Sequence, residues 1–175
     1  MDALLKIYRW LDAYIEKWVV IIAYAACAGI IFVEVVRRFV FSEQASWSTS
    51  VPAYMFLWLT WLGCSYAVKA RVHLRFGEVR NRLPRTGQYV MMQVDYLLYI
   101  LFGVVVIYYS TDLLGLQMMN FSLVPGTDDM PVWWFYLATP VGWSLLLFRV
   151  LQCVIIDFRD FTQGRELKLG GALDE

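Results

Sequence analysis

The chain has 175 residues, of which 60% are hydrophobic and 17% are charged, and its mean hydropathy is +0.55. An ordinary soluble domain has about 45 to 50% apolar and about 25% charged residues, so this composition argues against a soluble enzyme. Lys and Arg together number 15, as do Asp and Glu, so the net charge is zero. The chain therefore lacks the basic excess that binds nucleic acid.

The few residues that could carry chemistry are poorly placed for it. Cys27, Cys64 and Cys153 stand singly inside apolar runs, without the spacing of a zinc or dithiol motif. His73 is the one histidine, which excludes a haem held between two histidines. No serine is placed with a histidine and a carboxylate in a recognised order. We therefore expect a protein that is not an enzyme and holds no cofactor and no metal.

Four stretches are long and apolar enough to cross a bilayer as helices, which takes about 20 residues. Pro52 is suited to a first helical turn, where Ser50 can cap the helix, and Pro140 is expected to kink the fourth span. The sequence thus predicts an all-α integral membrane protein that forms one domain over residues 1–175. Its four predicted transmembrane helices cover residues 18–38, 51–69, 93–115 and 131–153.

The segment before the first span, residues 1–17, has a pattern of its own. Leu4, Ile7 and Leu11 recur at helical spacing, and charged residues fall mainly on the opposite side. This pattern is typical of an amphipathic helix that lies in the headgroup layer, and we expect an interfacial N-terminal helix here. The alternative is that the segment simply continues the first transmembrane helix into water.

Basic residues predict how the chain is oriented. Thirteen of the 15 Lys and Arg residues fall in the three segments that four spans place on one side, and only Arg37 and Arg38 fall on the other. The positive-inside rule therefore puts both termini, including a tail over residues 154–175, in the cytoplasm. The opposite side carries an acidic excess, made by Glu34, Glu43, Asp112, Asp128 and Asp129.

Glu34 is the main ionisable candidate at membrane depth, where burying a charge is costly. It lies one helical turn before Arg37 and Arg38, so an ion pair at the membrane interface is the simpler interpretation. The alternative is a contact or coupling site for a partner. The middles of the four spans are otherwise almost wholly apolar, which indicates that a transported substrate takes a path outside this chain.

The spans also offer surfaces for helix packing. Gly63 and Ala67 are small residues four apart, which is the spacing that lets helices approach closely. Trp58 and Trp61 share a helix face with Tyr54, and this stripe suits packing against another helix or, alternatively, against a partner. The residues alone therefore predict an accessory membrane subunit with four spans.

Three segments together resemble a known family. They are FVEVVRRFVF (Phe32 to Phe41), FLWLTWLGCSYAVK (Phe56 to Lys69) and VHLRFGEV (Val72 to Val79). In order and spacing they are similar to the small membrane subunit, of the DctQ type, of tripartite ATP-independent periplasmic (TRAP) transporters. One departure concerns Trp47, because family members commonly follow this tryptophan with glutamates, and here serine and threonine follow it.

The resemblance implies a function and a set of partners. In such systems a large multi-span subunit carries the substrate and sodium sites and moves by an elevator-type mechanism, while a soluble periplasmic binding protein delivers an organic acid. The small subunit packs against the static scaffold of the large one in the bacterial inner membrane. The expected partners are therefore the large TRAP membrane subunit, the periplasmic binding protein and membrane lipids.

Two other functions stay open at this point. One is a self-contained, proton-coupled antiporter of the small multidrug type, with Glu34 as its carrier, and the other is a scaffold subunit of an unrelated membrane complex. For Arg38, His73 and Arg75, anchoring to lipid headgroups is as good an explanation as contact with a protein. The candidate partner contacts are Glu34, Arg38, Trp47, Trp58, Gly63, His73 and Arg75.

Overall fold

The computed structural model describes residues 2–72 and 82–167, with side chains from residue 18 onward. Within these ranges it contains helices and no strand, apart from an isolated bridge between Leu123 and Pro131. Four of its spans are long and apolar enough to cross a membrane, so the predicted all-α membrane fold is confirmed. The helices are α1 (Asp2–Val40), α2 (Ser50–Lys69), α4 (Arg85–Met119), α5 (Trp133–Tyr136) and α6 (Ala138–Thr162).

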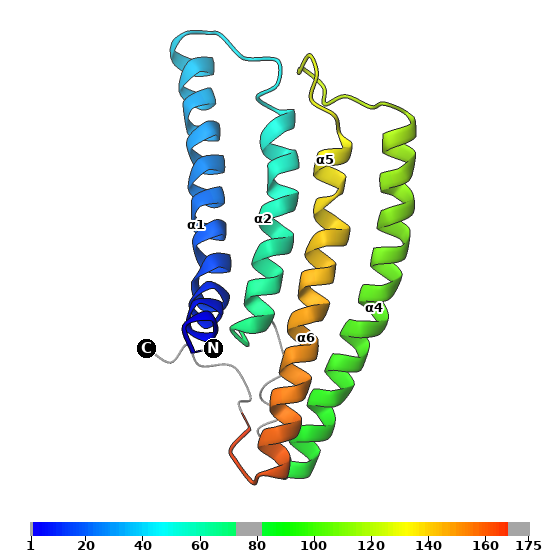
Figure 1. Ribbon diagram of the computed structural model, residues 1–175. Coiled ribbons are helices and arrows are strands. Elements are labelled where there is room, and N and C mark those ends of the chain that lie inside the picture. Colours follow the sequence, from blue (N-terminus) through cyan, green and yellow to red (C-terminus); the bar gives the residue numbers. More distant parts are fainter. Residues whose placement is uncertain (1, 73–81, 168–175) are drawn as a thin grey trace.

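The long helices stand side by side in a row (Figure 1). Within the described residues, α1 contacts α2, α2 contacts α6 and α6 contacts α4, whereas α1 contacts neither α6 nor α4. The centre of the row is therefore α6. In the most apolar stretch of the α5–α6 span 39% of residues are buried, against 11% in that of α1. Because none of the other described segments covers the row, large apolar side chains are exposed on every long helix.

The core lies where α2, α4 and α6 meet. The Trp143 ring lies 5.5 Å from the ring of Trp61 and 5.3 Å from that of Phe102. Gly142 makes this close approach possible, because a Cβ at its position would overlap the Cβ of Trp61. Small residues on α6 thus serve packing inside the chain. The buried residues of this core are Val68, Met92, Tyr96, Trp143, Leu146, Val150 and Cys153.

Two helices extend well beyond the predicted spans. The 35 residues of α4 include all of the predicted span 93–115 and begin directly after Pro84. At 1.5 Å per residue this helix is about 52 Å long, against about 30 Å for the hydrocarbon core of a bilayer. The helix α6 continues past residue 153 to Thr162, so the first part of the predicted tail 154–175 is helical.

The fourth span is disturbed near its start, although the backbone at Leu137 stays helical, with φ −59° and ψ −25°. The sequence predicts a helix from residue 131 with a kink at Pro140, but Pro131 lies in the isolated bridge and α5 forms only one turn. Leu137 separates that turn from α6. Pro140 has no N–H for the carbonyl of Tyr136, four residues earlier, and this missing hydrogen bond explains the disturbance. The disturbance therefore lies one turn before the proline rather than at it.

The start of α2 differs from the prediction in its cap. Thr49, not Ser50, is the N-cap residue, and it makes no capping hydrogen bond through its side chain. The preceding turn is held by the backbone instead, because the N–H of Val51 donates to the carbonyl of Trp47 at 3.0 Å. Pro52 lies in the first turn, where its missing N–H leaves no intrahelical bond unmade.

The N-terminal helix is continuous from Asp2 to Val40. Residues 1–17, predicted as a separate amphipathic helix, therefore join the first transmembrane helix without a break after Asp2. Figure 1 shows the first turns of α1 end-on beside the N-terminus, turned away from the axis of the rest. Their place in the headgroup layer stays a prediction.

The contact at Gly142 makes a testable prediction for the fold. Gly142→Leu places a side chain where Trp61 already lies, and overpacking of this kind typically costs about 1–3 kcal/mol. Gly29→Leu is the matched control, because nothing lies within 4 Å of a Cβ at that position. Thermal unfolding of the purified chain in detergent should show a lower midpoint for Gly142→Leu alone. Equal midpoints for the two variants would contradict the packing of α2 on α6.

Candidate functional site

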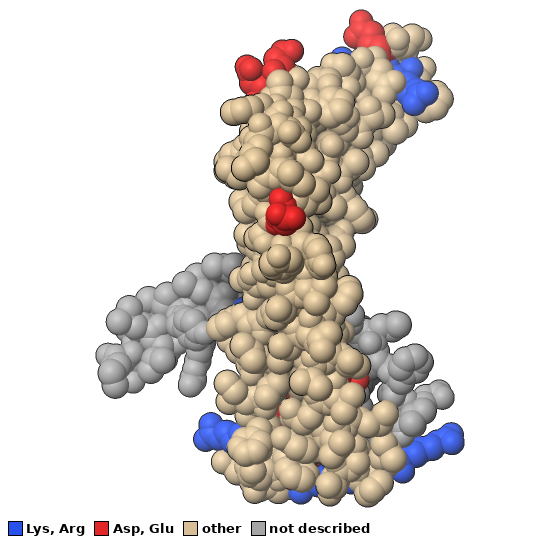
Figure 2. Space-filling model, turned by 90° about the vertical axis from the view of Figure 1, so that its right-hand side faces the viewer, with Lys and Arg blue, Asp and Glu red and all other residues tan. Residues whose placement is uncertain are grey.

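Charged side chains gather at the two ends of the helix row, and the surface between the ends is mostly uncharged, apart from an acidic side chain on the edge that faces the viewer (Figure 2). We call the end with the 41–49 and 120–132 loops the acidic end, and the opposite end the basic end. Arg37 and Arg38 are the basic residues that lie at the acidic end. The acidic end carries Glu34, Glu43, Asp128 and Asp129, and the basic end carries Lys69, Arg71, Arg82, Arg85, Arg159 and Arg165.

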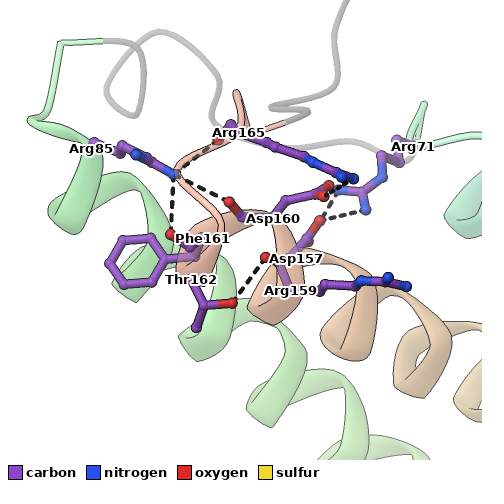
Figure 3. A network of polar contacts seen from close by, with 8 residues as sticks. All are labelled: Arg71, Arg85, Asp157, Arg159, Asp160, Phe161, Thr162 and Arg165. Atoms are coloured by element: carbon purple, nitrogen blue, oxygen red, sulfur yellow. Dashed lines mark hydrogen bonds and ion pairs between the residues drawn. The ribbon is translucent and has the colours of Figure 1, made fainter.

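Among the described side chains, the most deeply buried ionisable group is that of Asp157, which lies near the basic end of α6 and is 0% exposed. Arg71 donates two hydrogen bonds to its carboxylate, from Nη2 to Oδ1 at 2.5 Å and from Nη1 to Oδ2 at 3.1 Å (Figure 3). The hydroxyl of Tyr96 donates to Oδ2 at 2.5 Å. This single carboxylate therefore joins the end of α2, the side of α4 and the body of α6.

Arg71 reaches Asp157 because α2 ends in a Schellman turn. The N–H of Arg71 bonds to the carbonyl of Val68, and the N–H of Val72 bonds to the carbonyl of Ala67, both at 3.1 Å. Arg71 itself adopts φ +57°, in the left-handed region that glycine usually fills at this position. Such a backbone costs about 1–2 kcal/mol in a residue with a Cβ, and the buried ion pair offsets that strain.

The surroundings of Arg71 keep it charged. Burial by itself lowers the pKa of Arg71, but the hydrogen bond to Asp157 and the negative charge of that carboxylate outweigh burial and raise the pKa above its ordinary value. Arg71 is therefore positively charged at every physiological pH. Both carboxylate oxygens accept hydrogen bonds from the protein, so the cluster fastens three helices together and does not resemble a ligand site.

Arg85 ties the first turn of α4 to the last turn of α6. Its Nη2 donates to the carbonyls of Asp160 and Phe161, each at 3.2 Å, and to that of Arg165 at 2.9 Å (Figure 3). The carbonyls of Asp160 and Phe161 lie in the last turn of α6, where they also accept the N–H groups of Arg165 and Gly164, and the carbonyl of Arg165 follows the helix. The guanidinium also lies over the Phe161 ring, 5.5 Å from its centroid, and the Tyr89 ring stacks on Phe161 at 4.2 Å.

Glu34 is buried at the acidic end and both of its oxygens are engaged. Its Oε1 lies 2.9 Å from Nη1 of Arg37, and its Oε2 accepts the N–H of Ala45 at 3.4 Å. The ion pair expected from the spacing is therefore present. Because the carboxylate holds the end of α1 against the following loop, this geometry does not favour a proton carrier. Arg38, the next candidate along the helix, is exposed.

The two loops of the acidic end meet beside Trp47. Ser46 Oγ donates to the carbonyl of Gly126 at 2.9 Å. Gly126 has φ +82°, and a Cβ at its position would overlap the backbone of Ser46, so only glycine fits this contact. Trp47 is half-buried and, together with Glu34 and Gly29, lines an open hollow of about 360 Å³. The structure therefore brings the candidates Glu34 and Trp47 together.

The tryptophans of α2 pack within the chain. The indole N–H of Trp58 donates to the carbonyl of Trp134 at 3.2 Å, and that of Trp61 donates to Oγ1 of Thr139 at 3.1 Å. This face of α2 therefore lies against α5 and α6, which favours the packing interpretation of the stripe over a partner surface.

Gly63 lies on a different side of α2. Nothing lies within 4 Å of a Cβ at its position, and it lines a groove of about 610 Å³ between α1 and α2. The other lining residues include Val20, Tyr24 and Ala67. Gly63 is therefore open to a partner. His73 and Arg75 fall outside the residues that the structure describes.

The sequence analysis missed the buried charges of α6. Asp157 falls in the predicted tail, although the buried positions Trp143, Leu146, Val150 and Cys153 continue to it at helical spacing. Following that period past residue 153 would have found it. Arg149 is buried too, where its Nη1 donates to Oε1 of Gln152 at 2.7 Å. In the described ranges no three His, Cys, Asp or Glu side chains come together as metal ligands.

Residues 27–160 match the family model described as "Tripartite ATP-independent periplasmic transporters, DctQ component". The chain belongs to this family. The resemblance based on the three motifs is therefore confirmed, and the protein is a small permease subunit of the TRAP type. With its four apolar spans, the family assignment also identifies a multi-pass protein of the inner membrane.

Several relatives are permease proteins of TRAP transporters. The chain is 26% identical, over 83% of its own length and 24% of the relative, to the isethionate TRAP transporter permease protein DctMQ of Oleidesulfovibrio alaskensis. It is 23% identical to the C4-dicarboxylate TRAP transporter small permease protein DctQ of Vibrio cholerae, over 79% of this chain and 68% of that one. The sialic acid TRAP transporter permease protein SiaT of Haemophilus influenzae is 23% identical over 83% of this chain. The chain spans about a quarter of the length of DctMQ and SiaT.

The Asp157 cluster makes a prediction about stability. Asp157→Ala leaves Arg71 buried without its counterion, and breaking a buried pair in this way costs about 3–5 kcal/mol. Asp160→Ala, three residues on, is the matched control, because its carboxylate lies 3.9 Å from an exposed Arg165 and such pairs contribute at most about 1 kcal/mol. Chemical unfolding in detergent measures both variants. Equal losses would show that Asp157 is not the main fastening of α6.

Proposed function

We propose that this small permease subunit is a static accessory part of its transporter, which packs against the scaffold of a larger membrane subunit. The supporting observation is the open row of helices. The faces of the row are apolar, as in a surface that packs against another membrane protein. The buried charged residues Glu34, Arg149 and Asp157 form hydrogen bonds with groups of the same chain, so these bonds do not engage a substrate. A subunit that moved a substrate by itself would place free polar groups near the membrane midplane.

Rigidity is the proposed contribution of this chain to transport. A transport domain that slides through the membrane needs a fixed surface beside it. The α6 helix is fastened to α2 and α4 at the basic end by Asp157 and farther along by Trp61 and Trp143. We propose that these contacts keep the row from shearing, so that it widens the immobile part of the complex.

The length of two relatives supports the proposal that this chain has a larger partner subunit. The match with DctMQ occupies 24% of that permease and the match with SiaT occupies 23%, so a region similar to this chain lies within a much longer permease. For the present chain we propose that the remaining permease function resides in a separate large subunit. The protein works as a heterodimer in this proposal.

The transported compound is proposed to be an organic acid. The relatives are named for isethionate, sialic acid and C4-dicarboxylates, which are all organic acids. Sodium-coupled uptake with a periplasmic binding protein is what the resemblance to TRAP transporters implies. We propose that the basic end and both termini face the cytoplasm, and that the acidic loops at the other end help to dock the binding protein.

The direct test is to co-express the tagged chain with the proteins encoded beside it, solubilise the membrane gently and determine the mass of what co-purifies. A much larger membrane protein in equal amounts is the expected result. A homodimer alone that drives proton-coupled efflux, and that Glu34→Gln silences, would overturn the proposal in favour of an antiporter.

Gly63 tests which surface the partner uses. Gly63→Leu fills the groove between α1 and α2 without a clash inside the chain, so it should lower recovery of the large subunit while this chain stays inserted. Gly63→Ala adds a single methyl group and serves as the matched control. Unchanged recovery with Gly63→Leu would remove this groove from the interface.

A further inference from the structure

Asp112 is an exposed carboxylate on the free edge of the helix row. Asp112 and Tyr96 lie on nearly opposite faces of α4, and the face with Tyr96 is turned toward α6. Ser110 and Thr111, which precede Asp112, direct their hydroxyls to the carbonyl of Ile107. From the residues that the structure describes, no hydrogen bond or ion pair reaches the Asp112 carboxylate. Figure 2 faces this edge and shows an acidic side chain surrounded by uncharged surface.

Large apolar side chains share this edge with Asp112. Tyr108, Leu116 and Met119 recur at helical spacing around it, and all three are exposed, Met119 by 78%. Phe121 follows the end of the helix and is 86% exposed. Its backbone has φ +47°, a left-handed conformation that bulky residues rarely adopt and that concentrates at functional positions. We call Tyr108, Asp112, Leu116, Met119 and Phe121 the α4 edge.

At no depth of α4 in a lipid bilayer do both Asp112 and the apolar residues of the α4 edge lie in an environment that suits them. Asp95 and Asp112 lie about 25 Å apart along the helix, which is less than the hydrocarbon thickness of about 30 Å. If Asp112 lies within the hydrocarbon, its charge lacks a counterion. If it lies outside, the apolar end of α4 up to Met119 projects about 10 Å farther, into headgroups and water. A protein partner resolves both conflicts.

We propose that the α4 edge is a docking surface for a membrane-embedded segment of the larger permease subunit, with a basic side chain placed opposite Asp112. The carboxylate selects an Arg or Lys, because an opposite charge is what satisfies a charge in a low-dielectric setting. The flanking apolar residues fit a hydrophobic segment on either side of that contact. This inference rests on the proposed function, since it names a surface by which this subunit meets the larger one.

Photo-crosslinking tests the surface in the intact complex. A benzoylphenylalanine probe in place of Phe121 or Tyr108 changes one exposed aromatic residue for another and keeps Asp112. Irradiation of membranes that contain both subunits should give an adduct with the mass of the two proteins together. An intact, co-purifying complex without such an adduct from either position would overturn the inference.

Charge reversal tests the proposed counterion. Asp112→Lys should reduce recovery of the large subunit by about tenfold or more, because like charges then face each other, and Asp112→Asn should reduce it less. Asp129→Lys makes the same change on an exposed loop of the same end and should recover the complex like the wild type. Equal recovery with Asp112→Lys and wild type would overturn the inference.

Two controls separate the possible failures. The amount of each variant that inserts in the membrane is measured without the large subunit. If Asp112→Lys does not insert, the recovery of the complex with Asp112→Asn and the adducts from the two probe positions test the docking surface instead. Absence of any larger protein with the wild-type chain contradicts the proposed function itself. Recovery of that protein without adducts, or without an effect at Asp112, contradicts only the docking surface.

Discussion

The enclosure of the Asp157 carboxylate within α6 determines where the neighbouring helices lie. A buried charge is stable only when it is paired and hydrogen-bonded, and in the described part of the chain its bonded partners are Arg71 after α2 and Tyr96 on α4. Both helices must therefore reach α6 at the same level. The contact of Trp61 with Trp143 and Gly142 repeats the link between α2 and α6 farther along, so two separate contacts fix these helices.

A row organised around one helix has a consequence for function. Lipid tails are as apolar as the helices, so helix association in a membrane depends on close packing and polar contacts rather than on the hydrophobic effect. Here those contacts unite α2, α4 and α6, while α1 contacts α2 alone among the helices that the structure describes. The chain thus has little interior and much apolar surface, which suits a subunit that acts by packing beside a larger protein.

Composition and hydropathy were enough to predict four membrane helices, because span length and apolar content follow directly from bilayer thickness. The Glu34–Arg37 pair could be predicted because it is local in sequence. The Asp157–Arg71 pair could not be predicted in the same way, since its members lie 86 positions apart and Arg71 occupies a turn position normally filled by glycine. Pro140 predicted a disturbance of the fourth span, but its effect falls one turn earlier, at the carbonyl of Tyr136, which receives no N–H from the proline. Whether the stripe at Trp58 packs inside the chain or on a partner could likewise not be predicted from the sequence. Both kinds of packing use the same residue types, so the structure was required to distinguish them.

The measurement that tests this account most directly is an experimental structure of the co-purified complex in a lipid bilayer, determined by electron cryo-microscopy. The account predicts that α1, α2, α6 and α4 keep their order in a single row, that Asp157 stays enclosed between Arg71 and Tyr96, and that the apolar surface of the row lies against a larger membrane protein. A closed bundle with α1 packed on α4, or a row that faces only lipid, would contradict it.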